Sequence, residues 1–183
     1  MGGSAISSDS PVHLDLVGQV AAGDTDALAA LYRLHGAALF RLARRLTASV
    51  EDAEDVLHDL FVGLPESIHK YHERGSLIGW LKRVLVRLAL MRLRAERRRH
   101  EVDLHEGISE AVAGRAADDF GRLDVERVMA TLPSDMRTVL VLRQTEGYSH
   151  QEIAALLGIT PGASRVRLSR AITLLKAALR GRT

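Results

Sequence analysis

The sequence predicts an all-α protein built from two small helical domains. Hydrophobic residues make up 46% of the chain and aromatic residues only 4%. The apolar residues are mostly Leu, Ala and Val, which favours the packing of helices over sheets. Basic residues concentrate in two blocks, Lys82 to Arg99 and Arg165 to Arg182, whereas the stretch from Glu101 to Asp119 is acidic. This pattern predicts two domains with a polyanion partner, joined by a flexible acidic linker at 100–122.

The first domain is expected over residues 14–99, after a disordered tail at 1–13. Asp24 is placed to cap its first helix, where leucines recur at helical spacing: Leu28, Leu31, Leu39, Leu42 and Leu46. A second helix opens in the acidic stretch VEDAEDV, because acids in a first turn complement the helix dipole. Pro65 should end or kink that helix. A polar loop or short helix follows, and a long helix is expected from Leu77 to about Arg99.

The second domain, expected over 123–183, ends in two short helices joined by a tight turn. Ser149 and Glu152 form a capping box that begins the first helix, and Gly158 ends it. Thr160 and Pro161 then begin the second helix. This second helix carries an apolar stripe on one side and small residues edged with arginines on the other. Because arginine in the major groove can reach guanine O6 and N7, the pair predicts a helix-turn-helix whose second helix reads DNA. A helical hairpin with a solvated basic edge is the alternative.

The chain resembles the extracytoplasmic-function (ECF) sigma factors of bacterial RNA polymerase. The segments EIAALLGI and RVRLSRA are similar to the family's carboxy-terminal domain. The segments ALYRLHGAALFRLARRL, EDAEDVLHDLFVGL and GSLIGWLKRVLVRLALMRLR match its first domain in order and spacing. The resemblance covers nearly the whole chain. It implies a sigma factor that directs the polymerase core to promoters; the alternative is a stand-alone helix-turn-helix regulator, which would bind duplex DNA without polymerase.

The resemblance also implies roles for particular residues. Docking on the polymerase is implied for Asp55, His58 and Asp59, where many members carry Gln-Glu in place of the last His-Asp pair. Contact with the minus-ten element is implied for Tyr71, His72, Ser76, Arg83 and Arg87. Contact with the minus-thirty-five element is implied for Arg165, Val166, Ser169 and Arg170.

Several of these positions have a second interpretation or depart from the family. Tyr71 could stack on a flipped base or serve as a core anchor, whereas Trp80 is expected in the core. Arg87 stands where the family often has Asn, and Val166 replaces a frequent serine, so Val166 could touch a thymine methyl group. Arg83 and Arg94 are expected to hold phosphates. The acidic linker resembles the family's inter-domain linker, which threads the RNA exit path.

Enzymatic activity is not expected, and no catalytic residue, metal or cofactor is predicted. Histidines with neighbouring acids occur at 69–72 and 100–105, but neither group has a pocket pattern around it. The chain has no cysteine, so disulfides and thiolate sites are excluded. No segment reaches the length of a membrane span and no secretion signal is seen, which predicts a cytoplasmic protein without membrane insertion. Because no sensory domain is present, an anti-sigma factor is an expected partner.

Overall fold

The structure is a computed structural model that describes residues 11–71, 76–105 and 123–180. Within these ranges the chain forms helices and no strand, as the composition predicts. The first domain consists of α1 (Pro11–Ala21), α2 (Thr25–Thr47), α3 (Val50–Val62), α4 (Leu64–Ser67), the 3-10 turn η1 (Ile68–Lys70) and α5 (Leu77–His105). The second consists of α6 (Leu123–Thr131), α7 (Ser134–Leu140), the π-helical turn η2 (Val141–Thr145), α8 (His150–Leu157) and α9 (Pro161–Arg180).

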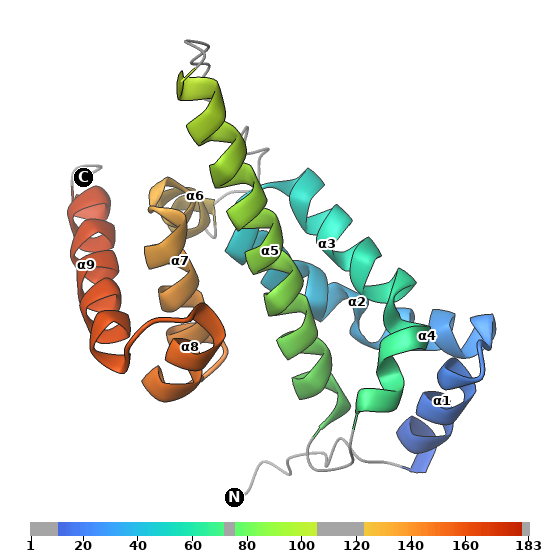
Figure 1. The fold of residues 1–183 in the computed structure, drawn as a ribbon. Coiled ribbons are helices and arrows are strands. Elements are labelled where there is room, and N and C mark those ends of the chain that lie inside the picture. Colours follow the sequence, from blue (N-terminus) through green and yellow to red (C-terminus); the bar gives the residue numbers. More distant parts are fainter. Residues whose placement is uncertain (1–10, 72–75, 106–122, 181–183) are drawn as a thin grey trace, which may run out of the picture.

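Helices α2, α3 and α5 pack together to form the core of the first domain (Figure 1). The leucine stripe expected on α2 supplies fully buried side chains, among them Leu31, Leu39 and Leu42. Leu81 and Leu85 of α5 meet them in the same cluster. Asp24 caps α2 as expected, since its carboxylate accepts hydrogen bonds from the backbone of the first turn at 2.8 and 3.1 Å.

The element boundaries differ from the sequence expectation in three places. Helix α1 begins at Pro11, inside the expected tail, and its Val20 is buried against the core. Helix α3 ends at Val62, before Pro65, and the short helix α4 follows. Helix α5 continues through His105 into the expected linker; residues 106–122 lie outside the described ranges. The differences arise at helix ends, where sequence patterns are least decisive.

The helix-turn-helix is confirmed in its local details. The Ser149 side chain accepts from the Glu152 backbone at 3.2 Å, and the Glu152 carboxylate accepts from the Ser149 backbone at 2.8 Å. These bonds lower the pKa of Glu152 below its usual range. Gly158 has φ 66°, the left-handed conformation that ends α8. Thr160 then caps α9 through a 3.1 Å bond from the Ala163 backbone.

The two domains pack against each other along α5 and the end of α2 (Figure 1). Val139, Leu142 and Ile153 of the second domain are buried in the same cluster as the first-domain core. Arg137 of α7 donates to the carbonyl oxygens of Leu46 and Thr47 at the end of α2, each at 3.2 Å. The structure is therefore a closed arrangement of the two domains.

Candidate nucleic-acid and polymerase interfaces

Helix α9 presents all four residues implied for the minus-thirty-five element on its exposed side. Arg165, Val166, Ser169 and Arg170 are exposed, and Val166 has 49% of its surface accessible. Ala171 on the opposite side is fully buried and belongs to a second cluster with Leu132 and Leu140. The apolar stripe therefore holds the helix to α6 and α7, which leaves its other side available to a groove of DNA.

Thr173, which helical spacing places on this side, shares the surface with His150 and Lys176, which were not expected there. His150, Thr173 and Lys176 line one groove of about 450 Å³ together with Arg165 and Ser169. A sequence signal existed for two of them, because Thr173 and Lys176 follow Arg165 and Ser169 at helical spacing. His150 comes from α8, and only the turn between the two helices brings it close.

His150 also ties the two helices of the motif together. A hydrogen bond of 2.9 Å joins His150 Nδ1 and Ser164 Oγ, and Ser164 is completely buried. Burial and the nearby charges of Arg143 and Arg165 hold the pKa of His150 below its usual range. The lowered pKa favours the neutral imidazole, and the bond to Ser164 helps to set the position of α9 against α8.

Helix α5 carries the exposed basic row expected from the sequence. Arg83, Arg87, Arg94 and Arg98 are all exposed along it. Ser76 precedes the helix and caps it, because its hydroxyl accepts from the Gly79 backbone at 3.2 Å. His72, implied for the minus-ten element, lies outside the described residues.

Tyr71 lies in the core, which adds a structural role to the one that the resemblance implies. Its surface is 9% exposed, and its ring packs against Trp80 with centroids 5.9 Å apart. Trp80 is itself partly buried against the core, as expected. Stacking of Tyr71 on a flipped base stays a prediction, and it would require the ring to become accessible.

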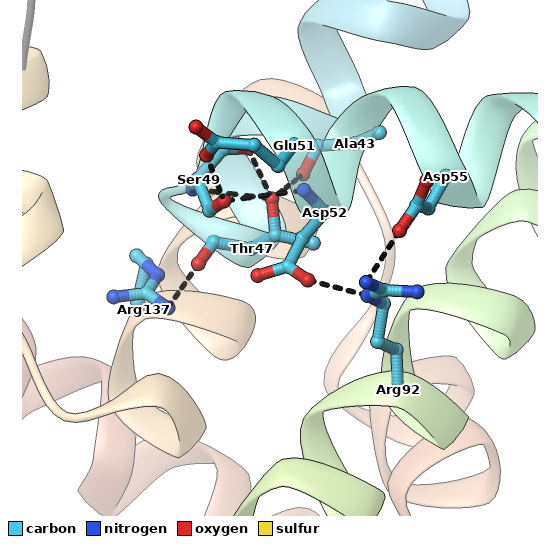
Figure 2. A network of polar contacts seen from close by, with 8 residues as sticks. All are labelled: Ala43, Thr47, Ser49, Glu51, Asp52, Asp55, Arg92 and Arg137. Carbon is cyan, nitrogen blue, oxygen red and sulfur yellow. Dashed lines mark hydrogen bonds and ion pairs between the residues drawn. The ribbon is translucent and has the colours of Figure 1, made fainter. Parts of the chain in front are cut away.

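On the acidic face of α3, Asp52 and Asp55 form ion pairs within the chain, whereas the residues that follow them on the same face do not take part in this contact. Arg92 of α5 binds both Asp52 and Asp55, and the Arg92 Nη2 to Asp55 Oδ2 distance is 2.5 Å (Figure 2). The hydrogen bond with Asp52, opposed by partial burial, is the main reason that the pKa of Arg92 is raised. His58 and Asp59 are exposed. Of the three residues implied for polymerase docking, Asp55 is thus engaged within the chain.

An apolar groove lies beside this acidic face. It has a volume of about 820 Å³ between α2 and α3. Tyr32 and Val62 on its wall are more than half exposed, while Glu54 and His58 place polar groups at the same groove. Large exposed apolar side chains in a groove are typical of a protein-binding surface.

The geometry therefore defines a two-domain helical protein with two separate basic helix faces and one acidic face beside an apolar groove. Comparison with known proteins agrees with this class. Residues 31–99 match the family model for sigma-70 region 2, and residues 122–175 match the model for sigma-70 region 4.

Individual relatives and solved structures give the same result. The ECF RNA polymerase sigma factor SigM of Mycobacterium tuberculosis is 31% identical over 159 residues, which is 87% of this chain and 80% of SigM. The structure of CnrH in complex with the cytosolic domain of CnrY is 28% identical, with a TM-score of 0.57 over 92% of this chain and 97% of that one. The sigma factor RpoE bound to the anti-sigma factor NepR from Bartonella quintana, at 24% identity, shows the same fold with a TM-score of 0.63, over 81% of this chain and 94% of that chain.

The chain belongs to the ECF sigma factors of bacterial RNA polymerase. It acts in transcription initiation by directing the polymerase to promoters, and a stand-alone regulator is not favoured. None of the helices in the described part of the chain is both long and apolar enough to cross a bilayer.

Proposed function

We propose that α9 reads the minus-thirty-five element, that α5 with the segment before it binds the minus-ten element, and that the exposed part of α3 docks on the polymerase. The observation that carries this assignment is the exposure of Arg165, Val166, Ser169 and Arg170 on one side of a helix whose other side is buried. In this arrangement the protein acts as a regulatory protein of the cytoplasm and not as an enzyme.

Within α9, we expect a division between base contacts and phosphate contacts. Lys176 follows Arg165 by 11 positions, which is about 16 Å along a helix at 1.5 Å per residue. The major groove is only about 12 Å wide. If Arg165 and Arg170 lie at base edges, Lys176 therefore reaches the phosphates at the wall of the DNA major groove. The groove of the protein that Lys176 shares with His150 then faces the same phosphate backbone.

Replacing Arg170 with alanine should relax promoter preference at one base pair of the upstream element. Loss of a bidentate contact with guanine costs about 1–3 kcal/mol and affects only promoters that carry that base. The measurement is binding of holoenzyme to a panel of single-base variants of the minus-thirty-five element at several salt concentrations.

Lys176→Gln is the matched control on the same helix. A phosphate contact carries no sequence information, so this variant should weaken binding to every promoter alike and lower the salt slope by about one. A uniform loss across the panel for Arg170→Ala as well would show that α9 is an electrostatic clamp, and its role as the reader would be rejected.

Asp59→Ala should weaken binding to the polymerase core with little change in stability, because Asp59 is exposed on α3. Asp55→Ala should lower stability in addition, since it removes a partner of Arg92. Core affinity measured by fluorescence anisotropy, together with the thermal midpoint of each variant, separates the two effects. Core affinity unchanged in Asp59→Ala would remove this acid from the interface.

The apolar groove beside α3 is proposed to bind an anti-sigma factor. CnrH, with 28% identity to this chain, was solved in complex with the cytosolic domain of CnrY. The exposed Tyr32 and Val62 fit the apolar side of a partner helix, and His58 lies both at the groove and on the proposed docking face. A partner bound in the groove would therefore compete with the polymerase.

A further inference from the structure

The first residue of α8 borders the surface of α9 that is proposed to face the minus-thirty-five element. His150 Nδ1 lies 2.9 Å from the Oγ atom of Ser164, and Ser164 is completely buried. Burying a hydroxyl group without a hydrogen-bond partner costs free energy. Within the described ranges Ser164 forms no other side-chain hydrogen bond, so its hydroxyl group depends on the imidazole of His150.

The direction of this bond determines which ring nitrogen of His150 carries the proton. If Nδ1 donated to Ser164, the buried hydroxyl proton would be left without an acceptor in the described part of the chain. The hydroxyl group therefore donates to Nδ1, and the neutral ring carries its proton on Nε2. Protonation of the ring reverses the direction of the bond and leaves the Nε2–H donor in place.

This Nε2–H donor belongs to a groove whose chemistry suits an anion. The groove has a volume of about 450 Å³, and its polar lining consists of His150, Arg165, Ser169, Thr173 and Lys176. These side chains bring two cations and two hydroxyl groups, and no acid is among the described residues that line the groove. Nε2 itself has no hydrogen-bond partner within those residues. A phosphate oxygen would supply the acceptor that this donor lacks.

We propose that His150 contacts DNA by donating from Nε2 to a phosphate beside the minus-thirty-five element, and that Ser164 is the positioning residue that orients the ring. This inference rests on the proposed function of α9. It adds a phosphate contact from α8, the other helix of the motif. It also requires a hydroxyl group at a position that is completely buried and that DNA does not touch.

The proposed contact makes promoter binding depend on pH. Helix α9 and the turn η2 pack on α8. Burial and the charges of Arg143 of η2 and Arg165 of α9 hold the pKa of His150 below its usual range, and Lys176 of α9 adds a cation at the same groove. On α8 itself, the Glu152 carboxylate is bound at the start of the helix. A phosphate brings negative charge to the ring and raises its pKa, so binding takes up protons and the affinity rises as the pH falls between the two pKa values.

The tautomer of His150 can be measured in the free protein. Long-range proton–nitrogen NMR correlation spectra distinguish a protonated ring nitrogen from an unprotonated one, and His150→Gln identifies the signals by their loss. At about pH 8, where the ring is neutral, the proton of His150 should reside on Nε2. Ser164→Ala should shift the Nδ1 signal, because it removes the hydroxyl donor. A ring protonated on Nδ1 in the wild type would overturn the role of Ser164.

Binding of the holoenzyme to a promoter at several pH values tests the phosphate contact. His150→Gln keeps a neutral amide donor but cannot gain a charge. From about pH 8 to about pH 6, the affinity of the wild type should rise at least about threefold more than that of His150→Gln, because a charged donor forms the stronger hydrogen bond. At the lower pH the salt slope of the wild type should be the steeper one by up to about one, as for one further cation at a phosphate.

A double-mutant cycle separates positioning from helix packing. Ser164→Ala should lower promoter affinity about threefold or more when His150 is present, and should have no effect when it is added to His150→Ala. A serine that acts through the packing of α9 would lower affinity in both backgrounds. Gln151→Ala is the control at the start of α8, because Gln151 is exposed and lines no part of the groove; this variant should keep the wild-type pH dependence.

Two binding results would overturn the proposal. The same pH dependence in the wild type and in His150→Gln would reject the phosphate contact. An equal loss for Ser164→Ala in both backgrounds would reject its positioning role. The preference of the wild-type holoenzyme among minus-thirty-five variants reports on the proposed function separately. Its absence would reject α9 as the reader, while the pH dependence would still decide whether His150 meets DNA.

Discussion

Tyr71→Ala should lower the free energy of unfolding by about 3–5 kcal/mol, the range for large aromatic side chains removed from a core. The ring is 9% exposed and packs against Trp80 at 5.9 Å, so its removal leaves a cavity between η1 and α5. Urea denaturation of the full chain measures the loss. Tyr32→Ala is the matched control, because Tyr32 is 52% exposed and its loss should cost far less. Equal costs for the two variants would contradict the burial of Tyr71.

The proposed role of Tyr71 in promoter melting needs a milder change. Tyr71→Leu keeps an apolar side chain in the core but removes the flat ring on which a base can stack. Stacking on an unpaired base is worth about 1–3 kcal/mol, so open-complex formation should fall by roughly 5- to 150-fold. Closed-complex binding through α9 should survive. An unchanged yield of open complex would leave Tyr71 with its structural role alone.

Arg137→Met should also destabilise the protein strongly, by about 3 kcal/mol or more. The guanidinium is buried, which lowers the pKa of Arg137, and its hydrogen bonds end on backbone carbonyls of two domains. It donates to Ala130 and Leu132 at 3.1 and 3.2 Å, as well as to Leu46 and Thr47 at the end of α2. Figure 2 shows the contact with Thr47. Methionine fills similar space but leaves these buried acceptors without their donor.

The control for Arg137→Met is Arg143→Met in the same domain. Arg143 is exposed, and its bond to the Tyr148 carbonyl at 3.1 Å lies at the surface. Thermal unfolding should show a large drop in midpoint for the first variant and a small one for the second. Similar midpoints would show that water replaces the guanidinium without cost, and that the bonds of Arg137 do not hold the helix ends together.

Helix starts and stops were readable from the sequence because they depend on neighbouring residues. Asp24, the capping box of Ser149 with Glu152, and Gly158 act within one turn of the backbone, and the structure confirms each of them. The exposed side of α9 was predictable for the same reason, since helical spacing alone separates Arg170 from the stripe that holds Ala171. The roles of these residues at a promoter stay predictions.

Tertiary structure decided what the side chains touch across the chain. Nothing near Asp55 in sequence indicates that Arg92, 37 positions later, would bind it, and helical spacing did not show that Tyr71 would be buried. The acidic character of Glu146 was visible, but its partner Lys82 lies in another domain. Local patterns act over a few residues of one helix, whereas these pairings depend on how whole helices pack. The sequence alone thus determined the helices, their caps and the exposed basic faces. Only the packing of the helices and domains decided which charged side chains form ion pairs within the protein.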